Sequence, residues 1–122
     1  MSDSQRLVGA WRLVGLDTGG RSAEAPGGQK PDGLIIYSAD GWMSAQIISP
    51  GEHDDGTVDH HAYFGPYSVD EAQSMVAHHR LYNTHEGPPD VPRRYSFPAD
   101  DMLEITPLNH QGVKLTFKRA GS

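Results

Sequence analysis

Cysteine is absent from all 122 residues, which excludes both a disulfide framework and a thiolate nucleophile. Long apolar runs are absent too: none approaches membrane-spanning length, and the polar first residues lack the apolar core of a signal peptide. Basic residues are few, with ten lysines and arginines in no run and a formal net charge of −6. Nucleic acid and anionic membranes are therefore not expected as partners, and the expected location is cytoplasmic.

Turn-forming residues are plentiful, with 14 glycines and nine prolines. This composition favours many turns and short strands over long helices. Hydrophobic residues make up 36% and charged residues 21%, which is typical of a globular chain rather than a disordered one. The length fits a single core, so one domain is predicted over residues 1–122, with no repeat, low-complexity tract or internal boundary.

Eight short segments, separated by turn residues, have the composition of β-strands. The clearest pair flanks Asp40-Gly41, because Asp-Gly readily supplies the positive φ angles of a tight hairpin turn. A helical turn that ends at Leu7 is expected before the first strand, with Ser4 as its cap. The predicted strands cover residues 10–16, 33–38, 42–48, 61–69, 75–82, 91–97, 102–106 and 112–119.

The two ends of the chain suggest that the sheet closes on itself. Trp11 stands early in the first predicted strand and Arg119 late in the last, which favours these two strands as neighbours. Eight strands is also the number at which a barrel interior is filled by side chains or holds one small ligand. We therefore predict an all-β, eight-stranded antiparallel up-and-down β-barrel, with Trp11 as a plug at one end and Arg119 stacked on its ring. An open sandwich of the same strands is the alternative fold.

Several of these segments also carry a family resemblance. Residues 9–13 (GAWRL) and the Asp-Gly and Met-Ser-Ala elements within residues 33–46 resemble the bacterial lipocalin-like domain family. The similarity continues over residues 62–67, 77–79, 94–95 and 115–119. The resemblance implies a small barrel with a cavity, but not one activity, since the family includes uncharacterised domains and relatives that act on natural-product intermediates. The acidic segment before Tyr63 and residues 82–92 depart from the family pattern, so the resemblance does not identify the ligand.

Strand alternation sorts the polar candidates of the predicted strands onto two faces. His78 and His79 must face opposite sides, and the sequence leaves open which one is inward. An inward histidine could move protons near neutral pH, and tyrosine or arginine could donate hydrogen bonds to a carbonyl as it becomes an enolate. The alternative is structural, with each polar tip bonded to backbone or water. The candidate catalytic residues are His78, His79, Tyr63 and Arg94, and the candidate ligand-binding residues are Tyr37, Met43, Gln46, Tyr67 and Tyr95.

Three classes of function follow for such a barrel. The favoured hypothesis is a cofactor-free enzyme that acts on a hydrophobic, carbonyl-bearing metabolite of polyketide or terpenoid type, by cyclisation, isomerisation or dehydration. The second is a non-catalytic carrier of a small hydrophobic molecule. The third is a structural module whose interior is filled by bulky side chains. An inward histidine beside a tyrosine or arginine favours catalysis, whereas a dry apolar cavity with one polar anchor favours carriage.

No cofactor is predicted. The glycine pairs at 19–20 and 27–28 lack the spacing and the following helix of a nucleotide-binding loop. No metal site is predicted either, because the histidines and aspartates of residues 53–61 match no zinc signature, and this segment is interpreted as a solvated loop or a lid. The expected partner is a small hydrophobic molecule, and a homodimer through an exposed strand face is compatible with the sequence.

Overall fold

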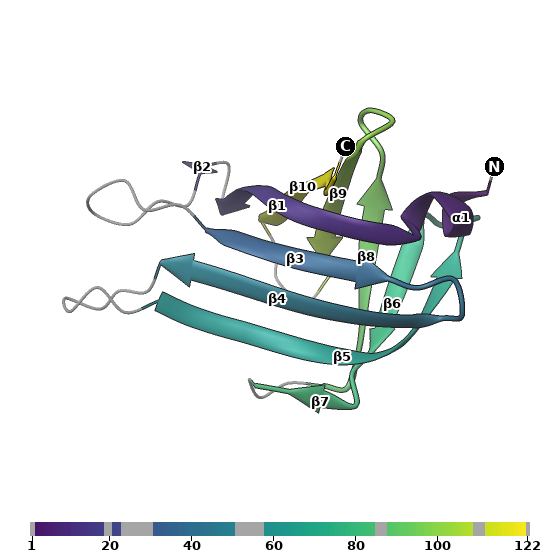
Figure 1. The fold of residues 1–122 in the computed structure, drawn as a ribbon, viewed down its shortest axis with the longest axis horizontal. Helices are drawn as coiled ribbons and strands as arrows, with labels where there is room; N and C mark the ends of the chain where they lie inside the picture. Colours follow the sequence, from purple (N-terminus) through teal and green to yellow (C-terminus); the bar gives the residue numbers. More distant parts are fainter. Residues whose placement is uncertain are drawn as a thin grey trace.

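The computed structural model describes residues 2–18, 21–22, 31–50, 58–84, 88–108 and 112–121. These residues contain one short helix and ten strands (Figure 1). In chain order the elements are α1 (Asp3–Leu7), β1 (Gly9–Thr18), β2 (Arg21–Ser22), β3 (Asp32–Tyr37), β4 (Trp42–Pro50), β5 (Val58–Asp70), β6 (Met75–His79), β7 (Tyr82–Asn83), β8 (Asp90–Ser96), β9 (Met102–Pro107) and β10 (Val113–Arg119).

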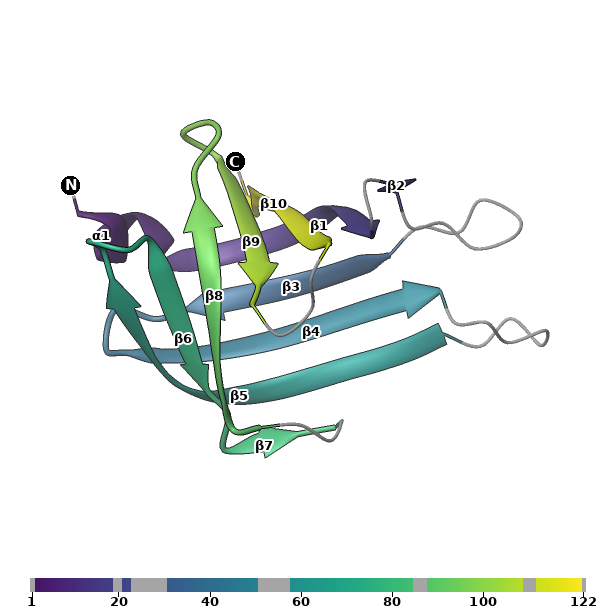
Figure 2. The same cartoon turned by 180° about the vertical axis from the view of Figure 1, so that it is seen from behind.

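The strands form one antiparallel sheet that closes into a barrel (Figure 1, and from behind in Figure 2). Along the sheet the order is β10-β9-β8-β6-β5-β4-β3-β1, and β1 pairs again with β10, beginning with Trp11 opposite Arg119. The short strands β2 and β7 are additions that pair with β1 and β5. Eight strands therefore make the closed wall. The predicted all-β barrel is confirmed, including the pairing of its first and last strands, and the open sandwich is wrong.

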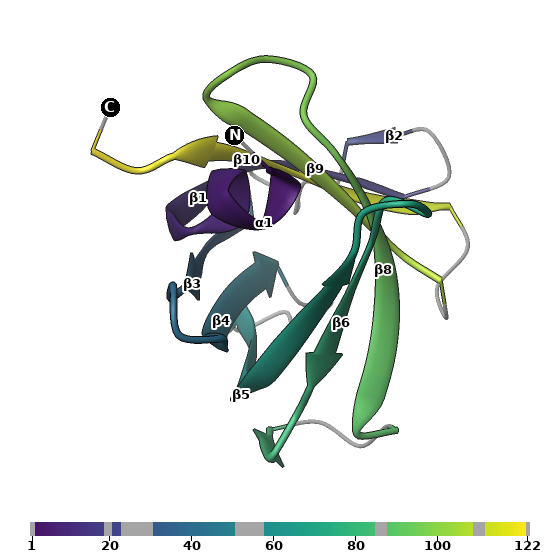
Figure 3. The same cartoon turned by 90° about the vertical axis from the view of Figure 1, so that its right-hand side faces the viewer.

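Helix α1 lies across one end of the barrel, which faces the viewer in Figure 3. Beneath it the Trp11 side chain is fully buried, and its Nε1–H donates to the Leu7 carbonyl at 2.8 Å. The Arg119 guanidinium lies 4.1 Å from the Trp11 ring centroid and donates to the carbonyls of Val8 and Arg6 at 3.0 and 2.7 Å. The predicted Trp11 plug with Arg119 stacked on it is therefore present at this end.

The predicted helix cap is wrong by two residues. Ser2, not Ser4, is the N-cap: its hydroxyl accepts from the Gln5 N–H at 3.2 Å, and the Gln5 side-chain oxygen accepts from the Ser2 N–H at 2.9 Å. This reciprocal capping box satisfies two donors that a cap at Ser4 would leave unbonded. Among the described residues, no helix has the length and apolar character needed to cross a membrane.

The strand predicted over residues 75–82 is interrupted. β6 ends at His79, and the chain bends before pairing with β5 again as β7. The bend is fixed by two backbone bonds, from Arg80 N–H to the Pro89 carbonyl at 2.8 Å and from Leu81 N–H to the Phe64 carbonyl at 2.9 Å. The alternation predicted for His78 therefore does not continue to Tyr82, which is exposed.

Candidate functional site

Three polar side chains meet inside the barrel, one from each of β3, β5 and β6. His78 is completely buried, and both of its ring nitrogens are hydrogen-bonded to tyrosine hydroxyls. The Tyr37 oxygen lies 2.6 Å from Nε2, and the Tyr63 oxygen lies 2.9 Å from Nδ1. Tyr37 is 1% exposed and Tyr63 5%, so all three are withdrawn from solvent. We refer to Tyr37, His78 and Tyr63 as the Tyr–His–Tyr cluster.

The cluster is electrically neutral. Burial, and then the positive charges of Arg93 and Arg80, hold the pKa of His78 well below its usual value. Burial raises the pKa of both Tyr37 and Tyr63, so their hydroxyls keep their protons. A neutral imidazole donates through one nitrogen and accepts at the other. One tyrosine hydroxyl therefore donates to His78 while the other accepts from it, and the accepting hydroxyl retains a proton for a further partner.

Two arginines border the cluster on the Tyr63 side. The guanidinium carbons of Arg80 and Arg93 lie 5.4 and 5.5 Å from the Tyr63 ring centroid. Arg93 is only 7% exposed, and its Nη1 donates to the carbonyl of Val91 at 2.8 Å. Arg80 donates to the Pro88 carbonyl through Nη2, while its Nε is buried without a hydrogen-bond partner among the described residues. Burial and the charge of Arg93 both lower the pKa of Arg80.

Several predicted site residues do lie in the interior. His78 is the inward histidine, a choice that the sequence leaves open, and Tyr37, Tyr63 and Met43 are buried with it. Other predicted residues are half-buried or directed to one end. The half-buried Tyr67 contacts the Tyr37 ring edge-on at 4.9 Å, and its hydroxyl donates to the Ser38 carbonyl. Tyr95 is buried, but its hydroxyl donates to the Asp3 carboxylate of α1 at 2.7 Å, at the plugged end.

Three predicted site residues lie on the outside of the barrel. His79 is bonded there to the Ser68 hydroxyl and the Asp90 carboxylate, at 2.9 and 2.8 Å. Arg94 is exposed and does not face the interior as expected of an inward arginine: the inward arginine of β8 is Arg93. Gln46 is exposed as well, because the inward positions of β4 are the odd-numbered ones such as Met43 and Ala45.

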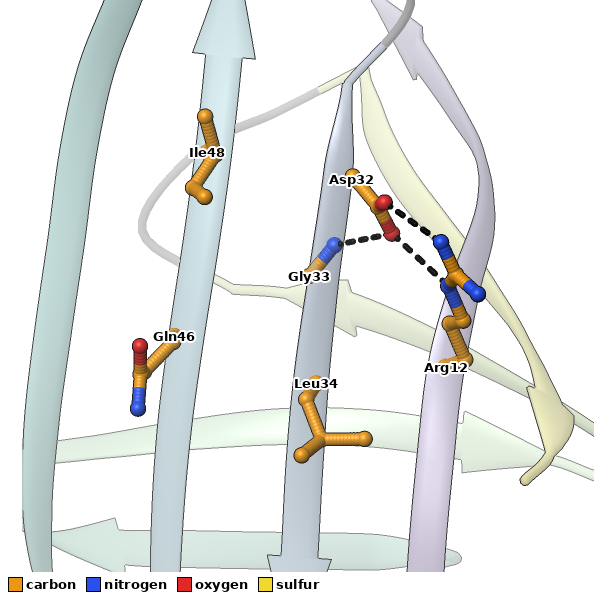
Figure 4. Close-up of a pocket in the computed structure, with 6 residues that line it drawn as sticks. All are labelled: Arg12, Asp32, Gly33, Leu34, Gln46 and Ile48. Atoms are coloured by element: carbon orange, nitrogen blue, oxygen red, sulfur yellow. Dashed lines mark hydrogen bonds and ion pairs between the residues drawn. The ribbon is translucent and has the colours of Figure 1, made fainter. Parts of the chain in front are cut away.

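Gln46 instead borders a surface hollow of about 290 Å³ over β1, β3 and β4 (Figure 4). Arg12 and Asp32 form a forked ion pair beside this hollow, with nitrogen–oxygen distances of 2.8 and 3.2 Å. Asp32 also accepts from the Gly33 N–H at 2.8 Å, and these bonds lower the pKa of Asp32. The carboxylate is therefore already bonded to its neighbours, and the hollow is separate from the Tyr–His–Tyr cluster.

Arg93 is the site residue that the sequence prediction missed. The signal was present, because the alternation that places Tyr95 inside also places Arg93 inside. The same rule applies to His61, two residues before Tyr63, whose ring lies 5.1 Å from the Tyr63 ring and whose Nε2 lies 2.8 Å from the Asn83 side-chain oxygen. No group of histidine, aspartate and glutamate suited to a metal occurs in the described part of the chain, and residues 53–57 of the segment that was considered for a metal lie outside it.

A family model described as a lipocalin-like domain matches residues 8–85, well over half of the chain. The chain belongs to the lipocalin-like domain family. The matched residues of this lipocalin-like barrel include Tyr37, Tyr63, His78 and Arg80, whereas Arg93 lies beyond them. A search of curated proteins finds no match. The lipocalin-like fold suggests binding of a small molecule and fits a hydrophobic ligand.

Proposed function

We propose that this barrel binds a small hydrophobic carbonyl compound in its interior and converts it without a cofactor, by cyclisation, isomerisation or dehydration. The Tyr–His–Tyr cluster is the observation that carries the proposal. Burying three polar side chains is unfavourable unless their hydrogen bonds are made. Here they are made to one another, and one tyrosine O–H is left over inside a closed wall of mainly apolar residues.

We assign the left-over proton to Tyr63. Of the two tyrosines it is the one flanked by Arg80 and Arg93, so negative charge on a ligand oxygen beside it would be favoured. In this arrangement the Tyr37 hydroxyl donates to Nε2 of His78, and Nδ1–H of His78 donates to the Tyr63 oxygen. Tyr63 then donates to the ligand carbonyl, and His78 is a positioning residue that fixes the direction of that donation.

The proton balance of these reactions closes without a cofactor. In an isomerisation or cyclisation, Tyr63 gives its proton to the carbonyl oxygen and becomes a phenolate. The phenolate then takes a proton from a carbon or hydroxyl of the substrate, which restores Tyr63. In a dehydration, the Tyr63 proton leaves with the substrate hydroxyl as water, and the proton lost from the neighbouring carbon replaces it. The barrel wall would add to the rate by holding a flexible substrate in its reactive conformation.

Carriage without conversion is the second candidate function. It is favoured by the apolar character of the buried side chains around the cluster, which include Ile35, Val76 and Ile105. In a carrier the left-over Tyr63 proton would serve only as a polar anchor for the ligand. The two functions differ in what the loss of that hydroxyl does: binding weakens in a carrier, whereas conversion stops in an enzyme.

The test begins with native mass spectrometry of protein purified from its own host, to identify a co-purified molecule. Conversion of that molecule is then followed with wild-type protein and Tyr63→Phe. Because general acid catalysis contributes about a hundredfold to ten-thousandfold, we expect conversion to fall by at least about a hundredfold. Tyr82→Phe removes the same atom from an exposed ring and should convert at the wild-type rate. A wild-type protein that binds the molecule but converts none would identify a carrier.

A further inference from the structure

Two positive charges in the barrel have no carboxylate to balance them among the residues that the structure describes. The ion pairs among the described residues join Arg12 to Asp32, His79 to Asp90, Lys114 to Glu104 and Lys118 to Asp101. Arg80 and Arg93 take part in none of them, and both donate only to backbone carbonyls. Each of these two guanidinium groups therefore lies beside Tyr63, and no carboxylate in the described part of the chain pairs with its charge.

Such a pair is unfavourable on its own. A buried guanidinium loses hydration, and the free energy is not recovered unless its donors are bonded and its charge is balanced. The buried Nε of Arg80 has no partner among the described residues, and Arg93 uses Nη1 on a carbonyl of its own strand. The two like charges also repel each other, which adds to the lowering of the Arg80 pKa. An anion bound by both guanidinium groups would accept a hydrogen bond from the unbonded Arg80 donor, balance the positive charge and reduce the repulsion between the two arginines.

We propose that the ligand of this barrel is an apolar carboxylic acid, and that Arg80 and Arg93 bind its carboxylate beside Tyr63. The planar fork of a guanidinium matches the two oxygens of a carboxylate. A singly charged anion suffices because Arg80 is only half-buried and keeps part of its hydration. The proposal rests on the proposed function in that the ligand is held in the interior, and it adds the chemical group by which the ligand is held.

The experiment uses a matched pair of fluorescent probes, dansylaminoundecanoic acid and its methyl ester, which differ in charge but little in shape. Each is titrated into wild-type protein, Arg93→Gln and Arg94→Gln. A hydrogen bond to a charged group accounts for roughly a tenfold to a hundredfold change in affinity. We therefore expect the acid to bind the wild type at least about tenfold more tightly than the ester. Arg93→Gln should remove that preference and leave ester binding unchanged.

Arg94→Gln is the control, because it removes the same charge from the next residue but on the outer face of β8. It should bind both probes as the wild type does. If Arg93→Gln fails to fold, Arg80→Gln replaces it, and the preference of the wild type for acid over ester still tests the carboxylate site. Equal binding of acid and ester in the wild type would overturn the carboxylate site while leaving an interior ligand intact. If the wild type binds neither the acid nor the ester, the interior site itself is contradicted.

Discussion

The imidazole of His78 is held neutral by its surroundings rather than by a charged partner. Its two nitrogens are bonded to Tyr37 and Tyr63, and Arg80 and Arg93 nearby oppose a third positive charge. Protonation would add a charge in a buried position and would replace one hydrogen-bond acceptor by a second donor. The cluster is therefore matched to one protonation state of His78, and pH should act on folding through this residue.

The free energy of unfolding should fall as the pH drops below about 6.5, the usual histidine value. His78 has a lower pKa in the folded protein than in the unfolded chain, so the unfolded chain takes up the proton first and stability rises with pH in this window. The contribution of this one group has a slope of up to about 1.4 kcal/mol per pH unit until the folded-state pKa is reached. Urea unfolding between about pH 7.5 and about pH 5 measures it.

His78→Gln should lack this part of the slope, whatever its overall stability. His79→Gln should retain it, because His79 lies outside and is bonded to Ser68 and Asp90. A slope for His78→Gln that equals that of the wild type would show that the pH dependence comes from other groups.

At the scale of elements, β5 lies between the strands that carry the other residues of the Tyr–His–Tyr cluster, because it pairs with β4 along its first part and with β6 along its last part. Its first part pairs with β4 as far as Pro66, and its last part pairs with β6 from Tyr67 onwards. Between them the chain of His79 passes over Gly65, where a Cβ atom would overlap the His79 carbonyl. Gly65 thus permits the close approach after which Arg80 turns toward the Tyr63 ring.

Gly65→Ala should reduce the free energy of unfolding by at least about 2 kcal/mol, because the new Cβ meets backbone that cannot move aside locally. Urea unfolding followed by circular dichroism provides the measurement. Gly15→Ala in β1 is the matched control, since its Cβ would lie 3.8 Å from that of Thr116, an ordinary contact. Equal stabilities of the two variants would contradict the proposed crowding at Gly65.

At the scale of the whole molecule, the barrel is closed by pairing residues from opposite ends of the chain. β1 and β10 run side by side from Trp11 and Arg119 to Thr18 and Val113. The Arg119 side chain adds contacts that backbone pairing cannot supply, because it joins β10 to the carbonyls of Arg6 and Val8 while covering the Trp11 ring. The last strand therefore stabilises the plugged end as well as the seam.

Arg119→Ala should reduce the free energy of unfolding by about 2 to 3 kcal/mol, through loss of two hydrogen bonds and the cation–π contact. Equilibrium unfolding followed by tryptophan fluorescence would report it, since the Trp11 ring is buried. Lys118→Ala, one residue away on the outer face, removes a charge that is 3.8 Å from Asp101 and exposed. It should change stability by less than about 0.5 kcal/mol. A comparable loss in both variants would mean that Arg119 contributes only as a surface charge.

The sequence by itself determined the eight strands of the barrel wall, apart from the end of β6, and the hairpin at residues 39–41. Turn chemistry and the two-residue period of strands are local properties, so these features follow from neighbouring residues. The same period determined that His78 and His79 face opposite ways, and likewise Arg93 and Arg94. It says which residues share a face, but not which face is inside.

Only the tertiary structure decided that His78 and Arg93 point inward and that Gln46 points out. Which face is buried depends on how all eight strands close, and that is settled by contacts between residues far apart in the chain. The end of β6 at His79 has the same origin, since it depends on the crossing over Gly65. The meeting of Tyr37, Tyr63 and His78 arises from three strands in this closed wall, and no local pattern in the sequence could specify their contact.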